Sequence, residues 1–334
     1  LDPERGVFIL VIFSYFIIGA LIIYSLKYSN LPVKSTYSLV SREIGFLLNN
    51  ILLVILATSI LFGTLFPLIY EALNDGAQIS VGAPYYEILI LPFAIGIAFL
   101  QGVGLYFGWG NTKDFSFLSR ISLESFSVFL VGCLLTFLIF GNLTSGVVIA
   151  LVLFSWILSG NFLDKLFNKD QSKKFVNFLY ARSGMVLAHV GTAFFILGVG
   201  MVSTFSLERD VILSQGEKYQ LGKYDFTFME IEKGAAPNFE STSARIKINY
   251  KENSFNLQTE KRYYPNSNQI MTEAGIRAGV IRDFYVTLGD SLDNDKWSFK
   301  LQIKPFIRWI WFGALLIALG TFFSSYKKIR EDNE

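Results

Sequence analysis

Arg182-Ser-Gly-Met-Val-Leu-Ala-His-Val-Gly-Thr-Ala-Phe-Phe-Ile-Leu-Gly-Val-Gly-Met201 is an apolar run long enough to cross a bilayer as one helix. It contains His189, the only histidine in the protein. An ionisable residue is costly inside hydrocarbon, so His189 is a candidate functional residue, and its ring nitrogen is a possible ligand for a metal or haem iron. The alternative is a neutral histidine that hydrogen-bonds a neighbouring helix, and this segment alone leaves both interpretations open.

Small residues follow one another along the same run, at Gly184, Ala188, Gly191 and Gly198. Their spacing predicts a strip on one side of the helix, next to the histidine. Such a strip lets a neighbouring helix, or a flat macrocycle, come close, and it is also an ordinary packing surface in membranes.

The composition indicates an integral membrane protein. The chain has 334 residues and is 52% hydrophobic, with a mean hydropathy of +0.44. A net charge of +2 gives no reason to expect nucleic acid as a partner. The single cysteine, Cys133, lies in an apolar run, so neither an intrachain disulfide nor a zinc or iron–sulfur site built on cysteines of this chain is expected.

Apolar segments of membrane-spanning length recur along the chain. Seven are found, near residues 6–26, 47–73, 84–108, 121–141, 145–163, 184–204 and 306–325. They predict a polytopic α-helical bundle of seven transmembrane helices in contact with lipid.

The loops between these segments predict the orientation. Lysines and arginines occur in every second loop, and the positive-inside rule places such basic loops in the cytoplasm. The basic residues are Lys27, Lys34 and Arg42, then Lys113 and Arg120, then Lys165, Lys169, Lys173, Lys174 and Arg182, and finally, in the C-terminal tail, Lys327, Lys328 and Arg330. The N-terminal end of the chain is therefore expected outside and the C-terminus inside. The region between the last two segments is expected outside, and His189 in the inner half of the membrane.

The region from 206 to 304 is polar and has the period-two alternation of half-buried strands. Strands are predicted at Tyr224–Ile231, Arg245–Tyr250, Phe255–Thr259, Phe284–Leu288 and Trp297–Ile303. They indicate a small, mostly β domain, either an open sandwich or a barrel, inserted before the last helix. The predicted domains are 1–205, 206–304 and 305–334.

Motifs for several other chemistries are missing from the sequence. It has no phosphate-binding loop of the Walker type and no G-x-S-x-G nucleophile elbow. Lys261–Tyr264 (KRYY) is interpreted as an exposed strand rather than as a site for a propionate or peptide. Arg308–Trp311 (RWIW) is interpreted as an aromatic anchor at the membrane surface rather than as a partner or haem contact.

Several stretches together resemble the C-terminal half of the CcmF family of membrane haem lyases. They run in family order: 1–10 (LDPERGVFIL), 41–50 (SREIGFLLNN), 63–67 (GTLFP), 79–85 (ISVGAPY), 185–191 (MVLAHVG), 208–210 (ERD), 260–265 (EKRYYP), 271–276 (MTEAGI), 282–289 (RDFYVTLG) and 304–311 (KPFIRWIW). The resemblance covers nearly the whole chain, and the ordered set is more specific than any one stretch.

The resemblance implies that His189 is an axial ligand of the iron of a transmembrane haem b. It implies a haem lyase that forms thioether bonds, attaching haem from the chaperone CcmE to the two thiols of a Cys-x-x-Cys-His motif in apocytochrome c on the outer membrane face. A thiol-handling subunit of the same pathway is a further implied partner. The implied location is the bacterial or mitochondrial inner membrane.

The family's tryptophan-rich segment, its outward-facing haem histidines and its second transmembrane histidine have no counterpart in this sequence. The resemblance therefore implies an incomplete enzyme, needing an N-terminal half from the same protein or from a separate subunit, and it assigns no catalytic residue to this chain. Because the sequence begins with Leu1, we expect a piece of a longer protein. A close haem lyase paralogue would look the same. The alternative function is a non-catalytic membrane scaffold that docks haem-chaperone and apocytochrome partners, and a transporter is a weaker third interpretation.

Overall fold

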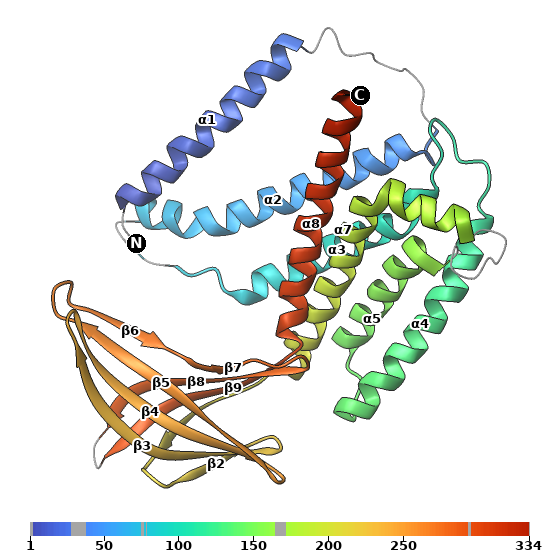
Figure 1. Ribbon diagram of the computed structural model, residues 1–334. Coiled ribbons are helices and arrows are strands. Elements are labelled where there is room, and N and C mark those ends of the chain that lie inside the picture. Colours follow the sequence, from blue (N-terminus) through green and yellow to red (C-terminus); the bar gives the residue numbers. More distant parts are fainter. Residues whose placement is uncertain are drawn as a thin grey trace.

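The computed structural model describes residues 3–27, 38–74, 77, 79–163, 172–292 and 295–333. Lys34, Lys165 and Lys169, on which part of the predicted orientation rests, lie outside these residues. Most of the helices pack together, the first helix stands apart from them, and a β domain is attached at one end of the packed helices (Figure 1). The helices are α1 (Pro3–Lys27), α2 (Arg42–Leu73), α3 (Ala83–Val103), α4 (Ser116–Phe140), α5 (Ser145–Leu158), α7 (Ser172–Phe205) and α8 (Ile307–Asn333), with the short turns η2 (Gly104–Tyr106) and η3 (Ser159–Leu163).

All seven predicted apolar segments fall on helices, but within the part of the chain that the structure describes only five helices are long and apolar enough to span a membrane. These five are Arg42–Leu73, Pro84–Val103, Ser116–Phe140, Ser183–Phe205 and Ile307–Tyr326. The described apolar stretches Val11–Lys27 and Ser145–Asn161 are shorter. Seven membrane spans are therefore not confirmed.

The helix α5 shows why one predicted span falls short. It has 14 residues, about 21 Å at the usual rise, against a hydrocarbon thickness of about 30 Å. The chain then continues as a π-helical turn, η3, rather than as α-helix. The opposite difference occurs in α7, which begins at Ser172, before the predicted start at 184.

The predicted small-residue strip on α7 packs against α8, and the two helices cross closely (Figure 1). A Cβ atom on Gly191 would lie 2.6 Å from the carbonyl oxygen of Gly313. A Cβ atom on Gly184 would lie 2.5 Å from that of Gly320. The strip therefore serves helix packing, and the expectation that it adjoins the histidine is wrong, because His189 contacts η3 on another side of α7.

The β domain is a sandwich of two antiparallel sheets. Sheet A has the order β1-β9-β8-β7, and sheet B has the order β2-β3-β4-β5-β6. The strands are β1 (Leu207–Leu213), β2 (Lys218–Leu221), β3 (Tyr224–Ala236), β4 (Phe239–Tyr250), β5 (Asn253–Tyr264), β6 (Gln269–Glu273), β7 (Gly275–Arg277), β8 (Arg282–Leu292) and β9 (Lys296–Pro305). All five predicted strands lie within β3, β4, β5, β8 and β9.

The core of the sandwich lies between the two sheets, as the alternation in the sequence requires. Phe226, Phe228 and Ile246 from sheet B meet Leu288 and Leu301 from sheet A, and each is at most 1% exposed. The strands that were not predicted are β1, β2, β6 and β7. β1 and β6 are mostly exposed at sheet edges and show no alternation over most of their length. β2 and β7 have only four and three residues, too few for a pattern to mark them.

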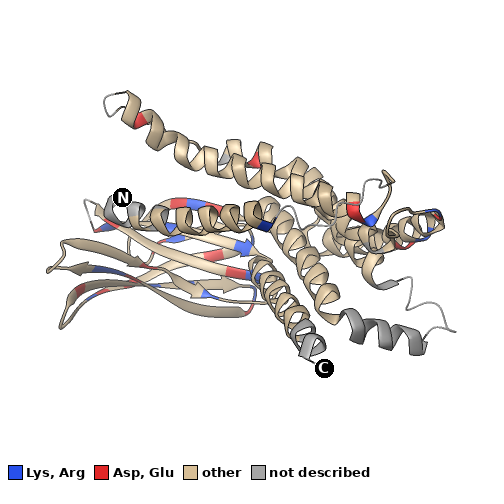
Figure 2. Ribbon diagram, turned by 90° about the horizontal axis from the view of Figure 1, so that it is seen from above, with Lys and Arg blue, Asp and Glu red and all other residues tan. Residues whose placement is uncertain are grey.

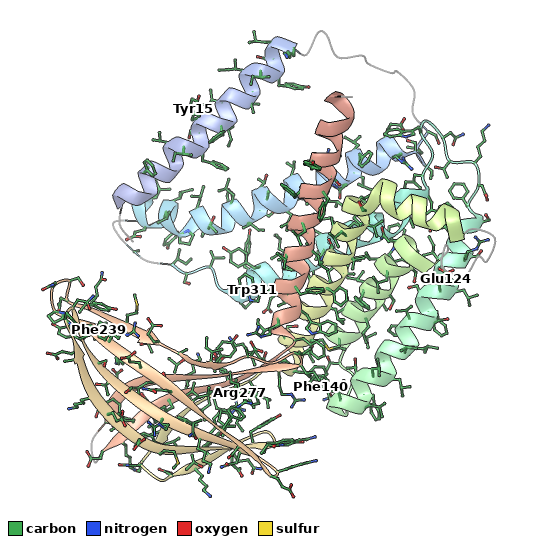
Figure 3. The ribbon with its side chains drawn as sticks, viewed as in Figure 1. Tyr15, Glu124, Phe140, Phe239, Arg277 and Trp311 are labelled. Atoms are coloured by element: carbon green, nitrogen blue, oxygen red, sulfur yellow. The ribbon has the colours of Figure 1, made fainter. Side chains whose placement is uncertain are left out.

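Aromatic residues join the β domain to the helices. Phe306, between β9 and α8, adopts a left-handed conformation with φ of 57° and is 7% exposed. It packs near Phe140 at the end of α4, which stacks on Phe205 with ring centroids 4.1 Å apart. Figure 3 shows Phe140 at the end of the helices that faces the β domain. The domain is therefore held against the bundle by packing as well as by its two chain connections.

The charged residues are distributed unequally between the helical bundle and the β domain. Lysine, arginine, aspartate and glutamate colour the strands, whereas most of the described helical ribbon carries none (Figure 2). Since charges are costly in hydrocarbon, this division fits a bundle in the membrane and a β domain in water.

Candidate functional site

The imidazole of His189 is held by a neighbouring turn. Its Nδ1 atom lies 2.9 Å from Oδ1 of Asn161, which belongs to η3. The side-chain amide nitrogen of Asn161 donates a hydrogen bond of 2.7 Å to the carbonyl of Ile157, one turn earlier. Asn161 is 2% exposed, whereas His189 is only partly buried. The site is thus a histidine on one helix whose ring is oriented by a buried amide on another.

The surroundings of this pair are tightly packed helices. Ala98, Leu153, Ile157 and Ala193 form a buried cluster that joins α3, α5 and α7. The indole nitrogen of Trp156 donates to the carbonyl of Phe99 at 3.1 Å, which ties the end of α5 to α3. These contacts fix the position of η3 relative to α7.

Further polar groups lie close to the pair in the sequence. The Gln101 amide lies 3.5 Å from the hydroxyl of Thr192, the residue three positions after His189. Within the described residues, Oε1 of Gln101 and the hydroxyl of Ser159 are buried without a hydrogen-bond partner. Polar side chains therefore lie near His189 within the packed helices.

The histidine fits one axial position of a haem iron. Asn161 uses one ring nitrogen, and no other hydrogen bond of the imidazole is found among the described residues, so Nε2 keeps its lone pair for a metal. A histidine held in this way is the usual arrangement of an axial ligand. Among the described residues no cluster of three metal-binding side chains occurs. Because His189 is the only histidine of the sequence, a second histidine ligand would have to come from another chain segment or subunit.

The KRYY stretch lies on β5 and splits between the two faces of sheet B. Arg262 pairs with Glu260 at 2.8 Å and with Glu273 at 3.3 Å, and its guanidinium lies 4.8 Å from the ring centre of Phe239. The Arg262 guanidinium holds the pKa of Glu260 below its usual value. The guanidinium of Arg262 is therefore engaged by two carboxylates and an aromatic ring of the same sheet, which explains its presence there without a ligand.

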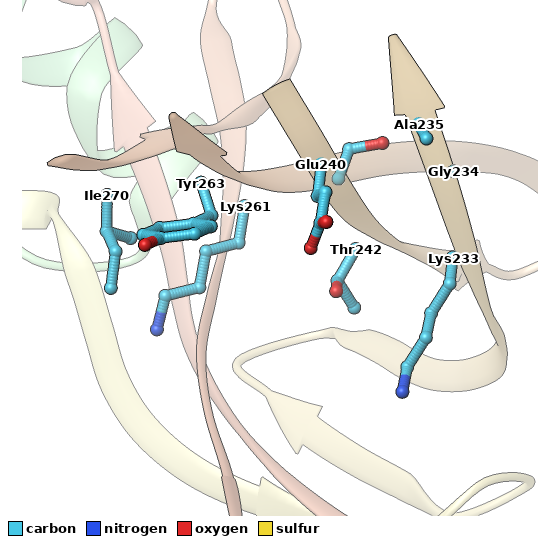
Figure 4. Close-up of a pocket in the computed structure, with 9 residues that line it drawn as sticks. Lys233, Gly234, Ala235, Glu240, Thr242, Lys261, Tyr263 and Ile270 are labelled. Atoms are coloured by element: carbon cyan, nitrogen blue, oxygen red, sulfur yellow. The ribbon is translucent and has the colours of Figure 1, made fainter. Parts of the chain in front are cut away.

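The side chains of Lys261 and Tyr263 line a groove instead (Figure 4). Its volume is about 560 Å³, and Lys233, Glu240, Thr242 and Ile270 also contribute. Lys261 lies 2.5 Å from Asp290 and keeps the pKa of that carboxyl below its ordinary value. Positive and negative groups are thus balanced in and around the groove.

The RWIW stretch begins α8, and its residues have different surroundings. Trp309 donates from its indole nitrogen to the carbonyl of Val280 at 3.0 Å, so it joins α8 to the β domain. Arg308 lies 3.4 Å from Asp283, a carboxylate that is 3% exposed. Trp311 is 72% exposed at the same end of α8 (Figure 3), where a membrane anchor would be placed.

Asn161 was not singled out from the sequence. The available signal is its position, since Ser159, Gly160 and Asn161 are small or polar residues near the end of the apolar segment 145–163. The sequence places Asn161 28 positions before His189. Only the packing of α5 against α7 brings the two side chains together.

The helical bundle, the intramembrane histidine and the β-sandwich inserted before the last helix define a class: a polytopic membrane protein with a water-exposed sandwich domain. Residues 204–305 match the family model described as the CcmF C-terminal beta-sandwich. Together with the relatives, this match confirms the resemblance to the C-terminal half of the CcmF family.

Three relatives show how far the likeness extends. The chain is 36% identical over 326 residues to the cytochrome c-type biogenesis protein CcmF of Pseudomonas aeruginosa, covering 96% of this chain and 49% of that protein. It is 33% identical to CcmF of Escherichia coli, with the same coverage of both. Identity to NrfE of Haemophilus influenzae, another cytochrome c-type biogenesis protein, is 30%, over 98% of this chain and 51% of that protein.

A solved structure of the cytochrome c haem lyase CcmF has the same fold. The TM-score is 0.70 at 22% identity, over 86% of this chain and 46% of the other. The chain therefore spans about half of the length of the relatives it matches. The membrane-spanning helices and these relatives support an inner-membrane protein.

Proposed function

We propose that the chain is the C-terminal part of a cytochrome c-type biogenesis haem lyase. The whole protein would bind haem b in the membrane and help attach haem through thioether bonds to Cys-x-x-Cys-His apocytochromes. The ordered likeness to CcmF over 96% of the chain is the main support. The held imidazole of His189, with Nε2 left for iron, supports the role of this residue as an axial ligand.

In this proposal the resident haem supplies redox chemistry, and the residues of this chain bind and orient it. His189 would hold the iron through Nε2, and the surrounding helices would restrict access of water. A second histidine would come from the N-terminal half, either within the same protein or from a separate subunit. CcmE, the apocytochrome and a thiol-handling subunit are the proposed partners.

The proposed orientation follows from the basic loops. The C-terminus lies inside and the sandwich domain outside, where apocytochromes receive haem. All seven apolar segments cross the inner membrane in this proposal, with the short α5 extended by η3. The proposed domains are 1–205, 206–304 and 305–334. Cysteine accessibility tests this orientation: a cysteine introduced at Asp295, in the β8–β9 turn, should react with an impermeant maleimide in intact cells, and labelling only after lysis would refute it.

The test of the haem proposal is a visible spectrum of the protein purified together with its N-terminal half. We expect two narrow low-spin bands on reduction, as a b-type haem with two histidine ligands gives. His189→Ala should remove the signal, whereas Thr192→Ala, a change on the same helix, should retain it. Full haem content in an assembled His189→Ala variant would refute the assignment of the ligand.

A second candidate function is a non-catalytic scaffold that docks partners through the β domain. The groove beside Lys261 and Tyr263 favours it, because its size suits a peptide segment. A haem-free preparation that remains assembled and still captures apocytochrome would support the scaffold over the lyase.

A further inference from the structure

We infer that Asn161 is a positioning residue that fixes the tautomer of His189 and thereby tunes the redox potential of the bound haem. The inference rests on the proposed haem function. It adds a residue from a different helix, with an effect that can be measured separately from haem binding.

The hydrogen bonds of the Asn161 amide assign its two ends. The nitrogen end donates to the carbonyl of Ile157 at 2.7 Å, so the oxygen end faces His189. An amide oxygen can only accept a hydrogen bond, and therefore Nδ1 of His189 must carry the proton. In a neutral imidazole the lone pair then lies on Nε2, at the opposite edge of the ring. The pair thus selects the tautomer in which Nε2 can bind iron.

The amide is held firmly enough to perform this role. Asn161 is 2% exposed, and both ends of its amide are bonded. Its neighbour Gly160 packs so closely on Gly102 of α3 that a Cβ atom there would collide with the Gly102 carbonyl. The π-helical turn therefore cannot slide along α3 without losing this contact. Turns of this kind often occur at functional sites, where they redirect a side chain.

The expected effect is on the iron. A hydrogen bond accepted from Nδ1–H increases the basicity of the ligating nitrogen, and a more basic ligand stabilises ferric iron more than ferrous iron. Removing the acceptor should therefore raise the midpoint potential. Loss of such an outer contact typically weakens a metal site by about 10–100-fold. A tenfold loss of affinity for iron, if it is confined to the ferric state, corresponds to a rise of about 59 mV in the midpoint potential of a one-electron couple.

The experiment is a redox titration of the protein assembled with its N-terminal half, followed by visible absorbance. Asn161→Leu should raise the potential by roughly 59 mV or more, if it follows the tenfold estimate. Asn161→Asp keeps an acceptor of the same shape and should give a potential at or below that of the unchanged protein. The matched control is Ser155→Ala, which removes a fully buried hydroxyl bonded to Leu151 in the same helix and should leave the potential unchanged.

The outcomes separate this inference from the proposed function. An Asn161→Leu protein with full haem and an unchanged potential overturns the positioning role, while His189→Ala still tests the ligand. If Asn161→Leu does not accumulate, Asn161→Asp decides, because a raised potential in that variant contradicts the inference and an equal or lower one supports it. Absence of haem from the unchanged protein refutes the proposed function itself.

Discussion

Substituting Gly191 by alanine tests the crossing of α7 and α8, where backbone meets backbone along the glycine strip. The added Cβ would lie 2.6 Å from the Gly313 carbonyl oxygen and 2.8 Å from the Ile317 backbone nitrogen, whereas ordinary contacts begin at 3.4 Å. Because both partners are backbone atoms, no side chain can rotate away, and the helices must separate. Overpacking of this kind costs about 1–3 kcal/mol.

The assay is thermal unfolding of the detergent-solubilised protein. Each kcal/mol lowers the midpoint of a domain of about 150–250 residues by about 2–4 °C, so Gly191→Ala should lower the midpoint of the helical part by several degrees. Gly19→Ala is the matched control, because a Cβ atom on Gly19 of α1 meets nothing within 4 Å. Gly313→Ala should resemble Gly191→Ala, and the double variant should cost less than the sum, since the first change already separates the helices.

Equal midpoints for Gly191→Ala and Gly19→Ala would refute the close crossing. Additive losses in the double variant would show instead that the two glycines act at independent contacts. Only the first result would contradict the role of the small-residue strip as the packing surface between α7 and α8; the second would contradict the coupling of the two glycines.

Three further predictions concern the β domain and its junction with the helices. Phe226→Ala should destabilise the sandwich by about 3–5 kcal/mol in denaturant unfolding followed by near-UV circular dichroism, because Phe226 is fully buried; a loss below about 1 kcal/mol would contradict its place in the core. Arg308→Ala leaves the buried Asp283 carboxylate without its cation and should destabilise the junction by about 1–3 kcal/mol, an effect that Asp283→Asn should reduce if the charge is responsible. A hydrogen bond from Lys300 holds the pKa of Glu208 below its usual value. The stability from this β1–β9 contact is therefore present above about pH 4.3 and is lost as the pH falls through the lowered pKa. Hydrogen exchange of β1 should speed up in acid, and Glu208→Gln should weaken this pH dependence.

Much of this architecture could be predicted from the sequence because it depends on local physical chemistry. Apolar length decides which segments can be helices in a membrane, and period-two alternation marks strands with one buried face. The helices and the five strands with a buried face were predicted on these grounds. The single histidine in an apolar run was recognised because a charge there is costly.

Local pattern fails where a neighbour determines the structure. The edge strands β1 and β6 have mostly exposed side chains, so their pairing with β9 and β5 is visible only in the sheet. The short α5 and the π-helical η3 depend on packing against α3 and α7. No periodicity in the sequence shows where such a turn begins.

The histidine site shows the same division between sequence and tertiary structure. The sequence determined that one ionisable ring lies inside the membrane-spanning segment 184–204, because its apolar neighbours leave no other environment for that helix. Only the tertiary structure decided which nitrogen of His189 is engaged, because its partner Asn161 comes from a helical turn 28 residues away. It also decided that the glycine strip faces α8, since the direction in which a helix face points depends on which neighbour packs there.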